Sequence, residues 1–280
     1  MRLRFLGTGT SAGVPSIGID PISDDPRDVR LRTSATLEFT DASGQERVIL
    51  IDAGPDLRQQ ALRAGLGRVD AILFTHNHVD HTWGLDEVRR FNVMMNRPID
   101  LYANEQTLDH LRRVYQHIFE PRANVQKSFV ASVIPHRIEP LRAFELHGLR
   151  ITPLPLLHGR LPVLGYRFDA AERGLSGEPR PGGVLPLGYC TDVNSIPPET
   201  WPLLDGLEVL VLDALRKRKH ATHFTLDEAV RAAERIGAGS TYFVHMNHEM
   251  VQAEIDAELP DGMQLAYDGL VLGGGGPAGA

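Results

Sequence analysis

The chain reads VDAILFTHNHVDH over residues 69–81, and this stretch is its most informative. The apolar run at 69–74 is bounded by polar residues and predicts a buried strand, which places the polar cluster at the strand's carboxyl end. The cluster consists of His76, His78, Asp80 and His81. Imidazole and carboxylate together suit zinc, manganese or iron. His76 and His78 point the same way from an extended backbone, and the other two fall on the next turn, so one loop could serve two adjacent metals.

A lone histidine is usually a surface residue or a satisfied core residue. That interpretation suits six of the chain's twelve histidines, namely His110, His117, His136, His147, His220 and His248. The cluster at 76–81 differs, because burying three imidazoles and a carboxylate without partners costs roughly 2 kcal/mol or more per unsatisfied polar group. A metal site is the interpretation that removes this cost.

The spacing H-x-H-x-D-H resembles the signature of the metallo-β-lactamase superfamily. The rest of that superfamily's ligand set follows in the same order, each residue after an apolar run: His158, Asp192 and His245. The resemblance implies two divalent metal ions, zinc or manganese. It assigns the first ion to His76, His78, His158 and Asp192, and the second to Asp80, His81, Asp192 and His245. It also implies an α/β fold, the four-layer αββα sandwich, with the site at strand ends.

The flanking segments resemble one branch of this superfamily more closely. They read FLGTGTSAGVP at 5–15, RLRTS at 30–34, IDAGPD at 51–56 and WGLDEVR at 83–89. These look like the branch that contains the phosphoribosyl 1,2-cyclic phosphate phosphodiesterase of phosphonate degradation. That enzyme carries a C-x-C-x-x-C cluster after the Gly-Val-Pro segment for a structural zinc. Here the matching positions are Ile19, Pro21 and Asp24, so we expect no structural zinc.

Several residues outside the ligand set are candidates for supporting roles. Asp52 ends the apolar run at 48–51 and is placed to accept the N–H of a ligand histidine, as carboxylates around metal sites do. Asp86 and Arg89 are three residues apart and could form an ordinary helix ion pair. In this branch of the superfamily, however, they could shape the mouth of the substrate site.

Proton transfer and phosphate binding have their own candidates. His223 lies at a helix start where the resemblance places a catalytic histidine that binds the phosphate or protonates the leaving oxygen, and His220 is a spare candidate. Asp80 is a second candidate for proton handling. Arg32 is a candidate for phosphate contact, because a guanidinium can pair bidentately with phosphate oxygens.

Length and composition bound the rest. Because the expected ligands extend from position 76 to 245 of 280 residues, both halves must close on one site, which favours a single domain over 1–272 and a flexible glycine-rich tail at 273–280. The lone Cys190 excludes an intramolecular disulfide framework. The apolar stretch at the amino terminus is too short for the apolar region of a signal peptide, and no apolar run is long enough to span a membrane. We therefore expect a cytoplasmic protein. The net charge of −7 does not indicate the strongly basic surface that nucleic-acid binders present, so we do not expect a nucleic acid as partner. The sequence does not determine the oligomeric state, and a homodimer is possible.

Apolar periodicity predicts a mixed α and β chain in two strand-rich halves. In the first half we expect strands at 3–6, 34–39, 48–51 and 71–74 and helices at 56–64, 85–95 and 105–119. In the second half we expect strands at 149–156, 164–168, 187–190, 209–212 and 241–244 and helices at 198–204, 226–236 and 250–258. Thr225 is predicted as the N-cap of the helix at 226–236, with Glu228 at its third position.

The resemblance implies a hydrolase in which two divalent ions lower the pKa of a shared water, so that hydroxide attacks a phosphoryl group. The first interpretation is a cyclic phosphodiesterase for a small phosphorylated sugar or nucleotide. The second is a tRNase Z-like RNA 3′-processing endonuclease, although the loop at 172–186 is too short and not basic enough for that enzyme's tRNA-binding arm. A thioester or lactam hydrolase, and a non-catalytic metal-binding carrier, stay open as alternatives.

Overall fold

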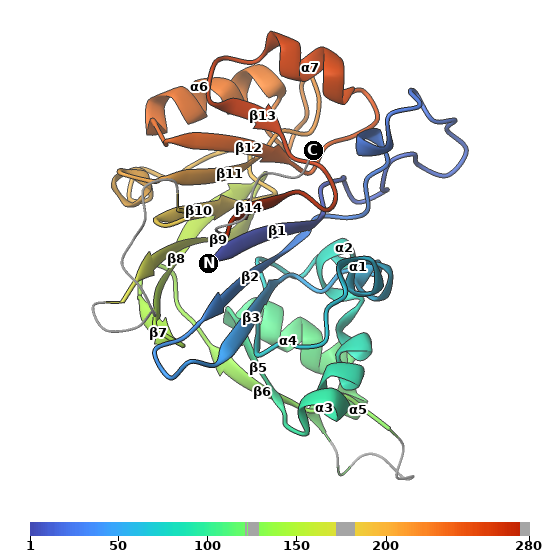
Figure 1. The fold of residues 1–280 in the computed structure, drawn as a ribbon, viewed down its shortest axis with the longest axis vertical. Coiled ribbons are helices and arrows are strands. Elements are labelled where there is room, and N and C mark those ends of the chain that lie inside the picture. The colour runs from blue at the N-terminus through green and yellow to red at the C-terminus, as the bar shows by residue number, and fades with distance from the viewer. Residues whose placement is uncertain (121, 123–128, 172–182, 275–280) are drawn as a thin grey trace.

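The computed structural model describes residues 1–120, 122, 129–171 and 183–274. In this part of the chain, two seven-stranded sheets pack face to face, and helices cover their outer faces (Figure 1). The expected α/β class and four-layer sandwich are confirmed. The loop predicted at 172–186 lies mostly outside the described residues, and so does most of the tail predicted at 273–280.

The first sheet is built from the amino-terminal half and one late strand. In order across the sheet, its strands are β14 (Val271–Gly273), β1 (Arg2–Gly7), β2 (Ser34–Thr40), β3 (Glu46–Ile51), β4 (Ala71–Leu73), β5 (Ile99–Ala103) and β6 (Val133–Arg137). Pairing is antiparallel from β14 to β3 and parallel from β3 to β6. The carboxyl ends of β3 and β4 therefore meet at one edge.

The second sheet repeats this layout. In order, its strands are β13 (Met263–Leu265), β12 (Ser240–Val244), β11 (Val209–Asp213), β10 (Leu187–Cys190), β9 (Leu161–Ala170), β8 (Leu149–His158) and β7 (Phe144–Leu146). Pairing is parallel from β13 to β10 and antiparallel from β10 to β7. The carboxyl ends of β10, β11 and β12 share one edge, which is where a site is expected in sheets of this kind.

The helices are short and lie outside the sheets. On the first sheet they are α1 (Leu57–Ala64), α2 (Val79–Thr82), η2 (Leu85–Val88), α3 (Arg89–Met95), α4 (Glu105–Val114) and α5 (Gln116–Phe119). On the second they are η4 (Trp201–Leu204), α6 (Leu226–Ile236) and α7 (Gln252–Glu258), and η1 (Pro26–Asp28) lies in the loop after β1. The capping box predicted for α6 is confirmed at Thr225 and Glu228. Among the described residues, no helix has both the length and the apolar character needed to cross a membrane.

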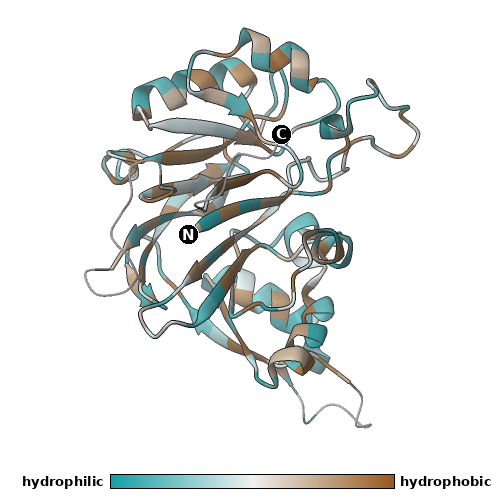
Figure 2. Ribbon diagram, viewed as in Figure 1, coloured by the Kyte–Doolittle hydropathy of each residue, from teal (hydrophilic) through white to brown (hydrophobic). Residues whose placement is uncertain are grey.

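The main core lies between the two sheets and receives side chains from both. Phe5 and Ile49 of the first sheet share one buried cluster with Tyr166 and Val211 of the second. Two further clusters lie under the outer helices, one on each side of the sandwich. Figure 2 shows the hydrophobic colour concentrated along the inner strands. Burying each large apolar side chain contributes about 1.5–3 kcal/mol. That the chain is one domain stays a prediction, which this shared core supports.

The structure corrects several predicted elements. The helix expected at 85–95 is divided into η2 and α3, and the helix expected at 105–119 breaks at Tyr115 into α4 and α5. Strands β6, β7, β13 and β14 were not expected, because they lie at or near a sheet edge and bury too few side chains for a clear apolar pattern. Strand β5 was also missed, although its residues alternate between buried and half-buried. The tail was predicted to begin at 273, but Gly273 belongs to β14 and pairs with Arg2.

Candidate metal centre

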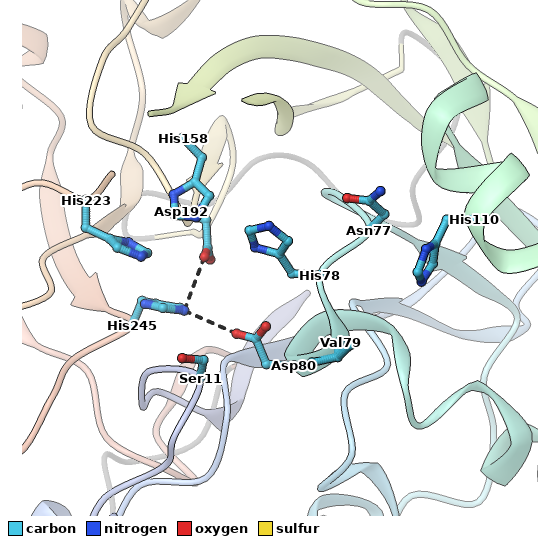
Figure 3. Close-up of a pocket in the computed structure, with 10 residues that line it drawn as sticks. All are labelled: Ser11, Asn77, His78, Val79, Asp80, His110, His158, Asp192, His223 and His245. Carbon is cyan, nitrogen blue, oxygen red and sulfur yellow. Dashed lines mark ion pairs between the residues drawn. The ribbon is translucent and has the colours of Figure 1, made fainter. Parts of the chain in front are cut away.

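The seven ligands expected from the sequence come together at one edge of the sandwich, at strand ends. Figure 3 shows His78, Asp80, His158, Asp192 and His245 among them. His76 and His78 lie in the loop after β4, and the short helix α2 adds the next two residues of the motif. His158 is the last residue of β8. The other two ligands follow β10 and β12 and are Asp192 and His245. The two strand-rich halves therefore contribute to a single cluster.

Left-handed backbone turns aim three of the side chains. Asp52, Asp192 and His245 each follow the end of a strand and have φ values of 59°, 53° and 63°. For a residue other than glycine this conformation costs on the order of 1 kcal/mol or more, and such strain gathers at functional sites. Here it turns the chain sharply at the sheet edge and leaves the Asp192 and His245 side chains lining the pocket.

Two glycines allow the ligand loop to lie against the loop after β3. A Cβ on Gly54 would stand 2.1 Å from the Asp80 carbonyl oxygen, and one on Gly84 would stand 2.0 Å from the Gly54 carbonyl oxygen. The backbones are joined by hydrogen bonds from Ala53 N to His81 O and from Gly84 N to Ala53 O, both 2.8 Å. Side chains at either glycine would push these loops apart and move Asp80 and His81.

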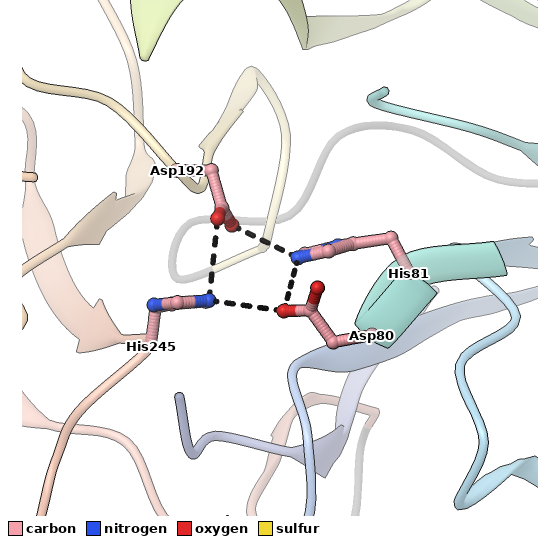
Figure 4. Close-up of side chains that lie close together, drawn as sticks. All are labelled: Asp80, His81, Asp192 and His245. Atoms are coloured by element: carbon pink, nitrogen blue, oxygen red, sulfur yellow. Dashed lines mark ion pairs between the residues drawn. The ribbon is translucent and has the colours of Figure 1, made fainter. Parts of the chain in front are cut away.

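Four buried residues, which we call the inner cluster, form the tightest group in the centre: Asp80, His81, Asp192 and His245 (Figure 4). His81 Nε2 lies 3.1 Å from one oxygen of Asp192 and 3.2 Å from Asp80. His245 Nε2 lies 3.2 Å from the other oxygen of Asp192 and 3.6 Å from Asp80. Both Nε2 atoms are buried, and neither has a hydrogen-bond partner in the described part of the chain. Ligand atoms that converge on a shared ion would leave these atoms in this state, so the donor set fits a divalent metal.

The charges of the inner cluster also call for a cation. Burial would lower the pKa of His81, but Asp192 and Asp80 outweigh burial and hold that pKa well above its usual value. Burial would also lower the pKa of His245. The neighbouring carboxylates, Asp192 foremost, outweigh burial and raise that pKa to about 9. The protons on these two imidazoles balance the buried carboxylates when no metal is bound. A divalent ion would displace them and supply the same charge.

The remaining three expected ligands are His76, His78 and His158, which we call the outer cluster. They share Asp192 with the inner cluster. The ligand atoms of His76, His78 and Asp192 lie within 4.8 Å of one another. The His158 ring is 5.1 Å from that of His78 and 5.8 Å from that of His76. His76 Nε2 is buried without a hydrogen-bond partner in the described ranges, whereas His78 is exposed. The outer cluster is therefore looser and closer to solvent.

Hydrogen bonds outside the ligand set fix the tautomers of three histidines. His81 Nδ1 is 2.7 Å from Asp52 Oδ2, the contact predicted for Asp52. The Thr75 hydroxyl donates to the same carboxylate and lies 2.9 Å from His76 Nδ1. His158 Nδ1 donates to the Thr222 carbonyl at 2.8 Å. In each case the proton on Nδ1 leaves the lone pair of Nε2 for a metal.

His223 lines the pocket but lies beside the ligands and belongs to neither predicted ligand set. Its ring lies 4.4 Å from the ring of His158 and 4.7 Å from that of His245. His223 Nδ1 donates to Asp213 Oδ2 at 2.8 Å, and Val193 N donates to the same oxygen at 2.9 Å. The free Nε2 of His223 is thus available to the pocket. Asp213 was not identified from the sequence. Like Asp52, however, it is a carboxylate at the end of a buried apolar run.

A cavity of about 480 Å³ opens beside the clusters. It is lined by Ser11, Asn77, His78, Val79, Asp80, His110, His158, Asp192, His223 and His245. His110 was interpreted from the sequence as an ordinary histidine, and its spacing on α4 gave no signal, because only the packing of α4 beside the ligand loop brings it here. Asn77 and Val79 alternate with ligands in the HxHxDH motif and could have been noted for that reason.

The structure does not bring three expected substrate contacts into this cavity. Arg32 Nη1 pairs with Asp56 at 2.9 Å, and Arg32 Nε donates to the Ser11 carbonyl. Asp86 and Arg89 pair with each other at 2.6 Å, the ordinary helix ion pair. None of the three is in the cavity lining, so the geometry gives no support to their proposed contact with substrate.

A family model described as a beta-lactamase superfamily domain matches residues 47–246, which contain all seven expected ligands. The chain belongs to the beta-lactamase superfamily. Its two mixed sheets and outer helices are the metallo-β-lactamase fold. The resemblance drawn from the HxHxDH motif is therefore confirmed.

Several known proteins are similar to this superfamily member. A solved structure described as a new diphosphatase from the PhnP family is 40% identical, covers 97% of both chains and superposes with a TM-score of 0.82. An octanoyltransferase from Porphyromonas gingivalis is 34% identical over 96% of this chain, but the chain spans about half (51%) of that protein. A ribonuclease Z from Kineococcus radiotolerans is 27% identical over 74% of this chain and 76% of that protein. Two of these relatives, the diphosphatase and the ribonuclease Z, support a hydrolase.

Proposed function

We propose that this protein is a phosphodiesterase that uses two divalent metal ions, zinc or manganese, to hydrolyse a small cyclic phosphate. The observation that carries the proposal is the position of Asp192, whose carboxylate belongs to both ligand clusters and lines the cavity. A carboxylate shared by two sets of imidazoles is what two adjacent ions require. The likeness to a PhnP-family diphosphatase supports phosphate chemistry over thioester or lactam hydrolysis.

Each group of residues has a separate task in this proposal. The inner cluster would hold one ion and the outer cluster the other, and the ions would supply positive charge and an activated water. Burial raises the pKa of Asp80, but His81 and His245 outweigh burial and hold it well below its usual range. Asp80 therefore stays ionised at neutral pH. It is suited to binding a cation and not to donating a proton.

Proton donation falls to His223 in this proposal. Its Nδ1 is engaged by Asp213, so a proton delivered to the leaving oxygen would come from Nε2, on the cavity side. The Asp213 carboxylate fixes the orientation and tautomer of the ring, as the acidic partner of a catalytic histidine does. Opening a cyclic phosphate leaves an alkoxide on the sugar, and this group needs such a proton.

The size and charge of the cavity favour a small substrate. Its volume of about 480 Å³ falls in the range of small-molecule sites. None of the described residues that line it is a lysine or an arginine, whereas proteins that bind RNA neutralise many phosphates with such side chains. The second candidate, RNA 3′-processing, is favoured by the ribonuclease Z relative. It therefore belongs in the test.

The test compares turnover across substrate classes in protein loaded with zinc or with manganese. The panel contains bis(4-nitrophenyl) phosphate, cyclic nucleotides, a ribosyl cyclic phosphate, a precursor tRNA, a glutathione thioester and a β-lactam. We expect hydrolysis of the phosphodiesters, fastest for the cyclic ones, with negligible turnover of the last two. Elemental analysis of the same protein should give two ions per chain.

The outcomes separate the alternatives. Faster cleavage of precursor tRNA than of any cyclic phosphate would move the protein to the RNA-processing class, and a thioesterase rate above the diesterase rate would contradict the proposal. Bound metal without turnover of any member would favour a carrier. Treatment with a chelator followed by metal addition is the control, because activity should disappear and return.

A further inference from the structure

The cavity has a second wall that belongs to neither ligand cluster. Figure 3 shows Asn77 and His110 on the opposite side of His78 from Asp192 and His245. We call Asn77 and His110 the distal pair. Both residues line the cavity, yet neither is in the ligand groups or in the hydrogen bonds that hold them. A phosphate held at the metal side would direct its attached group toward this wall.

His110 carries an unused polar atom. Its Nε2 is buried and has no hydrogen-bond partner in the described part of the chain. Such an atom costs free energy unless something pairs with it. Burial, followed by the charges of Arg113 and His78, lowers the pKa of His110. The ring is therefore neutral at pH 7, with one nitrogen that donates and one that accepts.

Asn77 complements this ring. It lies between two expected ligands, His76 and His78, so metal binding would fix its backbone position. Its amide makes no hydrogen bond to any described residue, which leaves one acceptor and two donors free. A neutral imidazole and a neutral amide, both able to donate and to accept, match a hydroxyl group, which does the same.

From this juxtaposition we infer that the distal pair is a specificity subsite for an uncharged, hydroxyl-bearing group attached to the scissile phosphate, such as the free hydroxyl of a sugar. A second phosphate fits less well, because the part of the lining that the structure describes has no lysine or arginine to balance its charge. The inference rests on the proposed phosphodiesterase activity and adds the chemistry of the group that the enzyme selects.

The test uses two substrates that differ by one hydroxyl: methyl riboside 2,3-cyclic phosphate and its 5-deoxy analogue. The wild-type protein should prefer the first in kcat/KM by about 10-fold, the effect of one hydrogen bond of ordinary strength. His110→Ala should remove this preference, mainly by raising KM for the hydroxylated substrate. His110→Gln, which keeps a donor and an acceptor, should restore part of it, and Asn77→Ala should reduce it.

The matched control is Asp109→Ala. This carboxylate is the neighbour of His110 on α4, is exposed and pairs with Arg112, so its loss should leave the preference intact. Metal content and Tm of each variant show whether the fold is kept. If His110→Ala affects both ribosides alike, or neither, the inference is wrong although the proposed function stands. If the wild-type protein hydrolyses neither these nor bis(4-nitrophenyl) phosphate, the proposed function fails and the inference with it.

Discussion

The inner and outer clusters share Asp192 but differ in burial, in charge and in how closely their ligand atoms lie together. The inner cluster is fully buried and contains a second carboxylate, Asp80. The outer cluster adds only imidazoles, and one of them, His78, is exposed. In the inner cluster, ligand atoms of four residues lie within 4.8 Å of one another. On the outer side, the corresponding group contains three residues, His76, His78 and the shared Asp192.

This difference teaches how one loop contributes to two unlike clusters of candidate ligands. His78 lies in extended backbone just before α2, and Asp80 and His81 lie within that helix. The helix turns them inward, where the loop after β3 packs on them. The site with more buried negative charge should bind its ion more tightly, and the exposed site should exchange its ion faster. In the proposed function, the imidazoles of the outer cluster would favour zinc, and the carboxylates of the inner cluster would also accept manganese.

The largest expected effect comes from removing the residue that the clusters share. Asp192→Ala should lose most of both ions and lower kcat/KM by roughly 10³-fold or more, since metal ions contribute several kcal/mol to such reactions. Elemental analysis and turnover of bis(4-nitrophenyl) phosphate measure it. Asp169→Ala is the control, because that carboxylate pairs with Arg167 away from the site. Retention of both ions by Asp192→Ala would contradict a shared ligand.

The second effect separates chemistry from metal binding. His223→Ala should lower kcat by roughly 10²–10⁴-fold, the range for loss of a positioned general acid, while both ions stay bound. The defect should shrink for 4-nitrophenolate, a leaving group that needs little protonation. If His223 only holds the phosphate, both kinds of substrate should suffer alike. The neighbouring His220→Ala serves as the control, and loss of an ion from His223→Ala would show that His223 is a ligand.

The third effect tests whether outside hydrogen bonds make the inner site tighter. Asp52→Asn weakens the partner of His81 Nδ1 and should lower the affinity of the inner ion by roughly 10–100-fold. The outer ion should respond less, because His76 keeps its contact with the Thr75 hydroxyl. Competition with a chromophoric chelator resolves the two affinities. Equal weakening of both ions would mean that the clusters do not differ in this respect.

The smallest effect is in the stability of metal-free protein. The pKa of His245 is raised from 6.5 to about 9, so its proton stabilises the fold fully below pH 6.5, and this stability is lost as pH rises through 9. Thermal melts should show Tm falling between these values, by roughly 2–4 °C for each 1 kcal/mol lost. The metal-loaded protein should not show this fall, because the ion replaces the proton. A flat metal-free curve would contradict the charge argument.

The sequence predicted much of the fold and most of the candidate site. Buried strands carry a clear pattern, which alternates in β2 (SATLEFT) and is continuous in β11 (VLVLD), so their positions were correct to within a few residues. Edge strands such as β6 and β14 expose most of their side chains and carry no such pattern. The seven candidate ligands were identifiable because each lies at or within a few residues of the end of a buried strand or in the short helix that follows one, where local sequence signals and position coincide.

The positions that were missed depend on contacts between distant segments. Asp213 acquires its importance from His223 and from the backbone of Val193, twenty residues earlier. His110 reaches the cavity only because α4 packs beside the ligand loop. Arg32 was a reasonable candidate for phosphate contact from its chemistry alone, but Asp56 engages its guanidinium first.

The sequence by itself determined the chemistry available to this protein, because the identity and local spacing of imidazoles and carboxylates at strand ends specify a metal-binding loop. Tertiary structure decided how that chemistry is distributed: which candidate ligands are buried, which histidine lies beside them, and which polar groups form the far wall of the cavity. Burial and hydrogen bonding between segments far apart in the chain set these properties, and no local pattern of residues encodes them.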